Sequence, residues 1–274
     1  MEPLLVFCHL KVDPDNVYSP ERDSVVKVEN CLDIVVDIVL FYIKTYKEKM
    51  GTKYNPRIVT NGLSVYVDAA NTRSYPGTGN TWYNLVTGAI GGTMVGVGYS
   101  TFNGGYFNFS GNYMTFASTP PVAQSTLSST VEIFAYRNNI GGFEVMFGGG
   151  NTDTNQAYYF GNRQNSSNFM NAYYNNDLDS STPTTNVAWN HYVATYDNST
   201  GRRATYYNGT LLLQNVSGAS NTSASVFMIG AFNLLGTPSY HFYGRIAYVK
   251  IYNRALTAQE ISQNYNSLKK RFSL

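Results

Sequence analysis

The chain has 274 residues and a net charge of +2, and only 13% of its residues are charged. Such a small and balanced charge excludes the basic surface that nucleic-acid binding requires. Aromatic residues make up 15% of the chain, and they favour strands because rings pack well on a pleated sheet. The length suits one large β domain with a small appendage.

The first 49 residues differ from the rest in charge and in pattern. They hold nine acidic and six basic residues, whereas residues 50–274 hold eight acidic and thirteen basic. Within them, "CLDIVVDIVLFYIKTY" places Asp33 and Asp37 on one helical face, and this stretch is too short and too charged to span a membrane. The start of the chain also lacks the basic segment of a secretory signal. We therefore predict an N-terminal extension over 1–49 with an amphipathic helix, either a functional element or an upstream extension.

From residue 50 onward, short apolar stretches alternate with clusters of Gly, Asn and Ser. In "GLSVYVDAA", Leu63, Val65 and Val67 alternate with polar neighbours, as in a half-buried strand. Among the stretches that follow, "TMVGVGYSTF" is predicted as one strand, and Asn208-Gly209 predicts a type I′ hairpin turn. Many short strands without intervening helices predict an antiparallel all-β sandwich over 50–274.

The chain is predicted to end in a short helix over 258–271. Thr257, followed three residues later by Glu260, forms the sequence pattern of a capping box. Apolar residues then recur at helical spacing, at Ile261, Tyr265, Leu268 and Phe272. The basic run that follows suits the negative end of a helix better than a nucleic-acid patch, at Lys269, Lys270 and Arg271.

Four stretches in this order carry a family resemblance. They are "NGLSVYVDAANTRSYPGTGNTWYNL", "NGGYFNF", "WNHYVATYD" with "YYNG", and "GRIAYVKIYNRALTAQEI". Through them, residues 52–274 resemble the concanavalin A-like lectin/glucanase jelly rolls of the laminin-G type, and more narrowly the single-domain versions common in phage structural proteins. The resemblance implies two facing antiparallel sheets in jelly-roll order and recognition of glycan or protein at one rim or face. Relatives often have aspartates where this chain has Ser110, Asn112 and Tyr113, so no calcium role is carried over through that stretch.

Catalytic signatures are missing from the sequence. A retaining glucanase needs two carboxylates about 5 to 5.5 Å apart, but Glu132 and Glu144 stand alone on separate predicted strands. No serine-hydrolase elbow or phosphate loop occurs, and both cysteines precede residue 32. We predict a protein that is not an enzyme. The alternative is a glycan-active hydrolase in which Glu132 and Glu144 meet across neighbouring strands.

Two loops offer groups for binding, "GGGNTDTNQ" (148–156) and "YYNNDLDSST" (173–182). Their oxygen atoms suit hard cations and sugar hydroxyls, and tyrosine rings can stack on a sugar face. We predict a shallow glycan-binding rim, with solvated turns as the alternative, formed by Asp153, Asn155, Tyr173, Tyr174, Asn175, Asp177 and Asp179. Asp177 and Asp179 form a D-x-D pair that could hold calcium, the one cofactor considered.

In "AWNHYVATYD", His191 and Asp197 suggest an acid–base pair. On one extended strand they would lie about 20 Å apart. We therefore predict that His191 is a packed sheet residue and that Asp197 opens the following turn.

These observations lead to one functional hypothesis with two kinds of partner. We expect a virion structural or decoration protein, located on the particle, whose lectin-like domain binds host-surface glycan or a neighbouring capsid or tail protein. In a purely structural alternative, the leader helix or an exposed sheet edge docks onto such a protein and no sugar is bound. A homo-oligomer on the particle is compatible with either.

Overall fold

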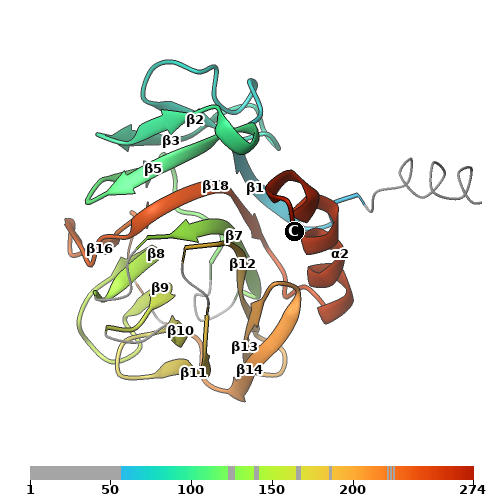
Figure 1. The fold of residues 1–274 in the computed structure, drawn as a ribbon. Coiled ribbons are helices and arrows are strands. Elements are labelled where there is room, and N and C mark those ends of the chain that lie inside the picture. Colours follow the sequence, from blue (N-terminus) through green and yellow to red (C-terminus); the bar gives the residue numbers. More distant parts are fainter. Residues whose placement is uncertain are drawn as a thin grey trace, which may run out of the picture. The chain divides into compact units, whose positions relative to one another are not determined.

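In this computed structural model, the described residues are 57–122, 127–138, 142–164, 168–184, 187–220, 222, 224 and 226–274. They form two facing β-sheets and one short C-terminal helix, which confirms the predicted all-β jelly-roll sandwich (Figure 1). The extension predicted over 1–49 and its amphipathic helix lie outside the described residues. Within the described part of the chain, no helix has the length and apolarity that crossing a membrane requires.

The first sheet has eight strands among the described residues, and in it the first strand of the domain pairs with the last. The strands run β14-β13-β12-β7-β18-β5-β4, and β1 pairs with β18. All of these pairings are antiparallel. The strands are β1 (Leu63–Asp68), β4 (Gly98–Ser100), β5 (Tyr106–Ser110), β7 (Ser129–Arg137), β12 (Trp189–Asp197), β13 (Arg202–Tyr207), β14 (Thr210–Val216) and β18 (Tyr243–Tyr252).

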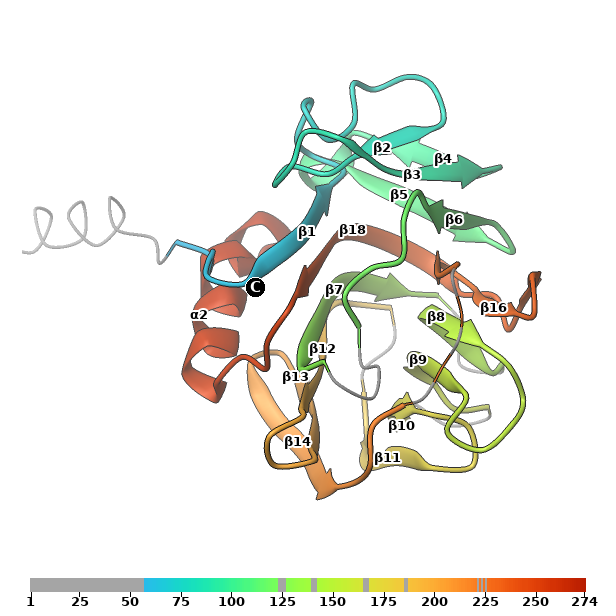
Figure 2. The same ribbon diagram turned by 180° about the vertical axis from the view of Figure 1, so that it is seen from behind.

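The second sheet has ten strands among the described residues. Its main path is β11-β10-β9-β8-β15-β6-β3-β2, and Figure 2 shows β8 to β11 side by side. The β16-β17 hairpin attaches to β8, where β16 and β8 run parallel. The strands are β2 (Thr81–Tyr83), β3 (Ile90–Val95), β6 (Tyr113–Phe116), β8 (Glu144–Gly150), β9 (Ala157–Asn162), β10 (Asn168–Ala172), β11 (Asp177–Pro183), β15 (Met228–Ile229), β16 (Phe232–Leu234) and β17 (Thr237–Ser239).

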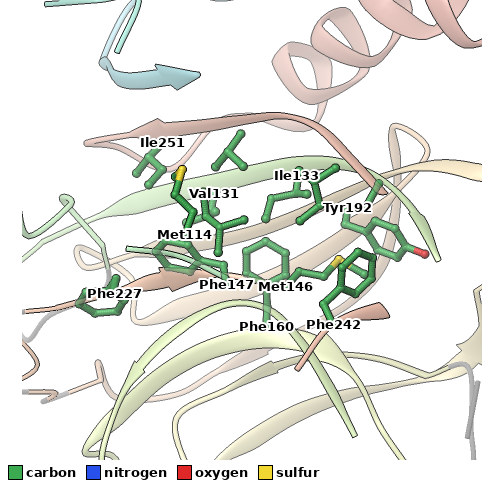
Figure 3. Packing of buried hydrophobic residues seen from close by; sticks show 14 of the residues in the cluster. Met114, Val131, Ile133, Met146, Phe147, Phe160, Tyr192, Phe227, Phe242 and Ile251 are labelled. Carbon is green, nitrogen blue, oxygen red and sulfur yellow. The ribbon is translucent and has the colours of Figure 1, made fainter. Parts of the chain in front are cut away.

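The main core lies between the two sheets. Side chains of alternate residues on facing strands meet there, among them Val131 and Ile133 of β7 and Phe160 of β9 (Figure 3). These side chains are fully buried. The alternation of apolar residues that predicts strands from the sequence therefore also determines which side chains fill the core.

Most local predictions from the sequence are confirmed, and one strand is shorter than predicted. Asn208 and Gly209 have φ values of 49° and 79°, as a type I′ turn between β13 and β14 requires. The predicted single strand "TMVGVGYSTF" is wrong, because Gly96 adopts a φ of 69° and separates β3 from β4. Only glycine adopts such a turn without steric cost.

The C-terminal helix α2 (Ala258–Leu268) packs on the outer face of the first sheet (Figure 1). Its predicted capping box is confirmed: Thr257 Oγ1 accepts from the Glu260 amide at 3.3 Å, and the Glu260 carboxylate accepts from the Thr257 amide at 2.9 Å. The helix was predicted to reach residue 271, but its last turn tightens into the 3-10 helix η2 (Lys269–Phe272). This turn places Phe272 on Phe134, with ring centroids 4.2 Å apart. The helix therefore covers part of that sheet face.

A fully buried polar cluster lies beneath α2. The Glu132 carboxylate accepts from Lys250 Nζ at 3.1 Å and from Asn264 Nδ2 at 2.7 Å, and His191 Nε2 lies 3.7 Å from Glu132 Oε2. Burial raises the pKa of Glu132, but Lys250, His191 and Asn264 together outweigh burial and lower it to about 2. His191 is thus a packed sheet residue, as predicted. Asp197 accepts hydrogen bonds from the turn after β12, which is also as predicted.

Candidate functional site

The outer face of the second sheet carries a pocket of about 320 Å³. Side chains from β9, β11 and β16 line it, together with residues of the adjoining loops. The lining residues are Phe143, Tyr159, Arg163, Gln164, Tyr174, Asn175, Asp177, Phe232 and Tyr240. Alternation along β9 explains this position, because Tyr158 and Phe160 point into the main core and Tyr159 points the other way.

Aromatic rings form the apolar part of the pocket. The Tyr159 and Phe232 centroids lie 4.9 Å apart, and those of Phe143 and Tyr240 lie 4.7 Å apart. Phe232 also stacks with Tyr240 at 6.2 Å. Tyr159 and Phe232 are almost fully buried, whereas Tyr240 is 44% exposed. The pocket therefore offers an aromatic floor with one exposed ring beside it.

A charged cluster forms another part of the pocket wall. Arg163 Nη2 donates to Asp177 at 2.5 Å, and Arg163 Nε donates to Asp179 at 2.8 Å. Burial lowers the pKa of Arg163, but the bonds to Asp179 and Asp177 outweigh burial and raise it above its ordinary value. The guanidinium also lies over Phe143, 5.6 Å from the ring centroid. Arg163 therefore connects the charged wall to the aromatic side.

Two tyrosines of the pocket have unusual backbone conformations. Tyr174 has a φ of 66° and Tyr240 a φ of 51°, and they are the two aromatic residues with positive φ in the described part of the chain. A bulky side chain in this region costs free energy. Tyr174 and Asn175, with a φ of 56°, form the tight turn between β10 and β11, and the surrounding structure holds the Tyr174 ring at the pocket.

Asn176 joins the two loops at this end of the sheet. Its Nδ2 donates to Asn155 Oδ1 at 2.7 Å and to Ser217 Oγ at 2.8 Å. From below, Arg203 Nη1 donates to the Asn176 carbonyl at 2.7 Å. Arg203 is fully buried and lies over the Tyr173 ring at 4.5 Å. These contacts position the Tyr174-Asn175 turn from its inner side.

Comparison with known proteins decides the family. Residues 108–262, more than half of the chain, match a family model described as the concanavalin A-like lectin/glucanases superfamily. The chain belongs to this superfamily.

Two solved structures are similar to this chain, and the first of them shows the same fold. Domain 4 of AbnA, an extracellular arabinanase from Geobacillus stearothermophilus solved with arabinotriose, is 17% identical, with a TM-score of 0.55 over 74% of this chain and 98% of that one. A structure titled as a putative carbohydrate-binding protein from Bacteroides ovatus is 19% identical, with a TM-score of 0.47 over 58% of this chain and 46% of that one. No curated protein matches the chain.

The structure brings together several of the residues that were predicted to form a glycan-binding rim. Tyr174, Asn175 and Asp177 line the pocket, and Asp179 adjoins it through Arg163. Asn155 belongs to the neighbouring loop and contacts Asn176, so the two predicted loops do meet. Asp153 is exposed on that loop and is not among the lining residues. Glycan binding by these residues stays a prediction.

The prediction for Tyr173 is wrong. Its side chain is fully buried in the main core, under Arg203, and cannot stack on a sugar. The neighbouring Tyr174 lies in the turn that follows β10, at a φ of 66°, and its side chain lines the pocket.

Asp177 and Asp179 do not fit a calcium ion. Each carboxylate already binds the Arg163 guanidinium, which supplies the positive charge that calcium would bring. Calcium takes about 6 to 8 oxygen ligands, and among the described residues no group of three or more His, Cys, Asp or Glu side chains could hold a metal. The calcium site proposed from the D-x-D pattern is thus replaced by an ion-pair cluster.

The alternative carboxylate pair, Glu132 and Glu144, is also not formed. Glu132 faces α2 on the outer side of the first sheet. Glu144, in the second sheet, is fully buried and pairs with Arg137 of β7. Burial raises the pKa of Glu144, although the bond to Arg137 opposes the shift. The two carboxylates lie in different layers and cannot flank one bond.

Sequence reasoning missed Arg163 and the aromatic residues that reach the pocket from other strands and loops, Phe143, Tyr159, Phe232 and Tyr240. One signal for Arg163 was present, because it is the single basic residue between Arg137 and Arg202. In a stretch that contains several carboxylates, an isolated arginine indicates a specific partner. The aromatic residues gave no comparable signal in a chain with 24 tyrosines.

Proposed function

We propose that this chain is a non-enzymatic glycan-binding protein whose site is the pocket on the outer face of the second sheet. The observation that carries the proposal is the pair of strained tyrosines, Tyr174 and Tyr240, held at the mouth of an aromatic pocket. Backbone strain concentrates at functional sites, because the rest of the fold stabilises it.

The chemistry of the pocket supports this proposal. Aromatic rings complement the apolar face of a sugar ring, while charged and amide groups hydrogen-bond to its hydroxyls. The pocket combines both, with Phe143, Tyr159 and Tyr240 beside Arg163 and Asp177. The similarity to an arabinanase domain solved with arabinotriose makes that trisaccharide a suitable first probe.

Calorimetric titration with arabinotriose, preceded by a glycan array of neutral and charged oligosaccharides, tests the proposal. We expect Tyr240→Ala to weaken binding by about tenfold or more, or about 1.4 kcal/mol. Tyr243→Ala is the matched control, because Tyr243 is similarly exposed, at 42% against 44%, but lies on β18 and does not line the pocket. Absence of binding to every glycan, or equal loss in both variants, would contradict the proposal.

The enzymatic alternative now has a different candidate pair. Asp177 and Asp179 are two apart on β11 and both reach Arg163 beside the pocket. Incubation with a polysaccharide panel, followed by measurement of reducing ends, separates the two functions. Release of reducing ends that is abolished in Asp179→Asn would overturn the non-enzymatic proposal.

We further propose that the protein is displayed on a virion, where it binds host-surface glycan or a neighbouring particle protein. The support is the resemblance of residues 52–274 to single-domain members found in phage structural proteins. Mass spectrometry of purified particles, together with the genes that flank this one, tests the location. Absence from particles and a gene far from capsid and tail genes would overturn it.

A further inference from the structure

The charges at the pocket bear on the class of glycan that it accepts. Arg163 and Asp177 are the charged residues that line the pocket among those described, and Asp179 is bound to the same guanidinium. One cation is therefore shared by two carboxylates. Together the two bonds use the Nη2 and Nε donors of Arg163.

A carboxylated sugar meets an unfavourable site in this arrangement. Tight recognition of a carboxylate uses an arginine fork with two parallel donors, but two donors of Arg163 are already bound to aspartates. A ligand carboxylate that reached the remaining donors would be a third anion beside Asp177 and Asp179, with one guanidinium shared among the three, and such like-charge contacts are costly. Arg203, the cation beneath the neighbouring turn, cannot compensate by contact, because it is fully buried and donates to Asn176.

A neutral sugar finds complementary groups at the same positions. Each hydroxyl both donates and accepts, so adjacent hydroxyls can donate to an aspartate oxygen and accept from the Arg163 guanidinium without breaking the cluster. The exposed amides of Gln164 and Asn175 add further donors and acceptors at the rim. The ion pairs hold the side chains of Arg163, Asp177 and Asp179 in place before a ligand arrives, and this reduces the entropy lost on binding.

We infer that the pocket selects neutral glycans and discriminates against glycans that carry a carboxylate next to the bound sugar. The inference rests on the proposed function and names the substrate class of that same site. The deciding juxtaposition is Arg163 bound by both Asp177 and Asp179 beside the aromatic floor.

Glycan pairs in which one member carries a carboxylate test the inference. Suitable pairs are methyl-esterified with de-esterified oligogalacturonide, which differ at the carboxyl group alone, and lactose with sialyllactose, titrated into the 274-residue chain. We expect the neutral member to bind about tenfold tighter or more, and the ratio to shrink as salt is raised, because salt screens exposed charges. Equal or tighter binding of the charged members would overturn the inference and leave the glycan-binding function standing. If neither member of any pair binds and the array is empty, the proposed function itself fails.

A charge-matched pair of variants assigns the effect to the cluster. Asp179→Asn removes one of the two anions, whereas Asp153→Asn makes the same change in charge on the neighbouring loop, outside the pocket lining. We expect the neutral-to-charged ratio to fall by about threefold or more in Asp179→Asn and to stay unchanged in Asp153→Asn. Equal effects in the two variants would show that net charge, and not the Arg163 cluster, sets the preference. The melting temperature of each variant reports whether the fold is retained, and the salt series on the unaltered protein does not depend on either variant.

Discussion

Tyr174 allows backbone strain to be separated from ligand contact. At a φ of 66°, a non-glycine residue costs about 1 to 2 kcal/mol. Replacement by glycine removes this cost, but it adds about 0.5 to 1 kcal/mol of unfolded-state entropy. It also forfeits the packing of a half-buried ring, about 1 kcal/mol from area. The terms nearly cancel, so the free energy of unfolding of Tyr174→Gly should lie within about 1 kcal/mol of the unaltered protein.

Tyr174→Ala is the matched control, because it loses the ring and keeps the strain. Glycine should therefore be more stable than alanine here by about 1 kcal/mol, the reverse of their order at ordinary positions. Urea unfolding measures the difference, and calorimetry measures binding, which should weaken about tenfold or more in both variants. If the Tyr174→Ala variant is as stable as the Tyr174→Gly variant, the assignment of backbone strain to Tyr174 is wrong. If both variants bind glycan normally, the Tyr174 ring has no role in recognition.

Four further predictions concern the fold. Glu132→Ala should lower the free energy of unfolding by about 3 to 5 kcal/mol, because it leaves Lys250 buried without its carboxylate partner; urea unfolding checks this, and a loss below about 1 kcal/mol would contradict the burial argument. The pKa values of Glu132 and Glu260 are lowered to about 2, Glu260 mainly by its hydrogen bond from Arg254, so the stability they contribute is full above pH 4.5 and is lost as the pH falls toward 2. Melting temperatures across that range should fall with pH, and less steeply in Glu260→Gln. Gly209→Ala should cost about 1 kcal/mol, because alanine is strained at a φ of 79°; unchanged urea unfolding would argue against a required left-handed turn. Thr257→Ala should cost about 0.5 to 2 kcal/mol by removing the cap of α2, and the same measurement in Ser267→Ala, outside the cap, provides the comparison.

Much of the fold was predictable because its signals are local. Alternation marks β1, the Asn208-Gly209 pair specifies a turn that needs two positive φ values, and Thr257 with Glu260 caps α2 through contacts three residues apart. In the candidate site, the turn that carries Tyr174 and Asn175 was also identified, since Asn and Asp cluster where strands end, although the predicted loop continues from Asp177 onward as strand β11.

The rest depended on which strands become neighbours. Arg163 meets Asp177 and Asp179 only because β9, β10 and β11 lie side by side, and this pairing turned a predicted calcium site into an ion-pair cluster. In the same way, Glu132 and Glu144 were separated when β7 and β8 joined different sheets.

Residue order alone determined where strands, turns and the helix cap form, because these follow from dihedral preferences and from contacts between near neighbours. Tertiary structure decided which face each side chain occupies and which charges meet. It placed Tyr173 in the core and Tyr174 at the pocket, although the two residues are adjacent and identical. The physical reason is that Tyr173 follows the end of β10 on its core side, whereas Tyr174 begins the turn at a φ of 66°, and only the packing of the second sheet against the first makes one face of β10 the interior.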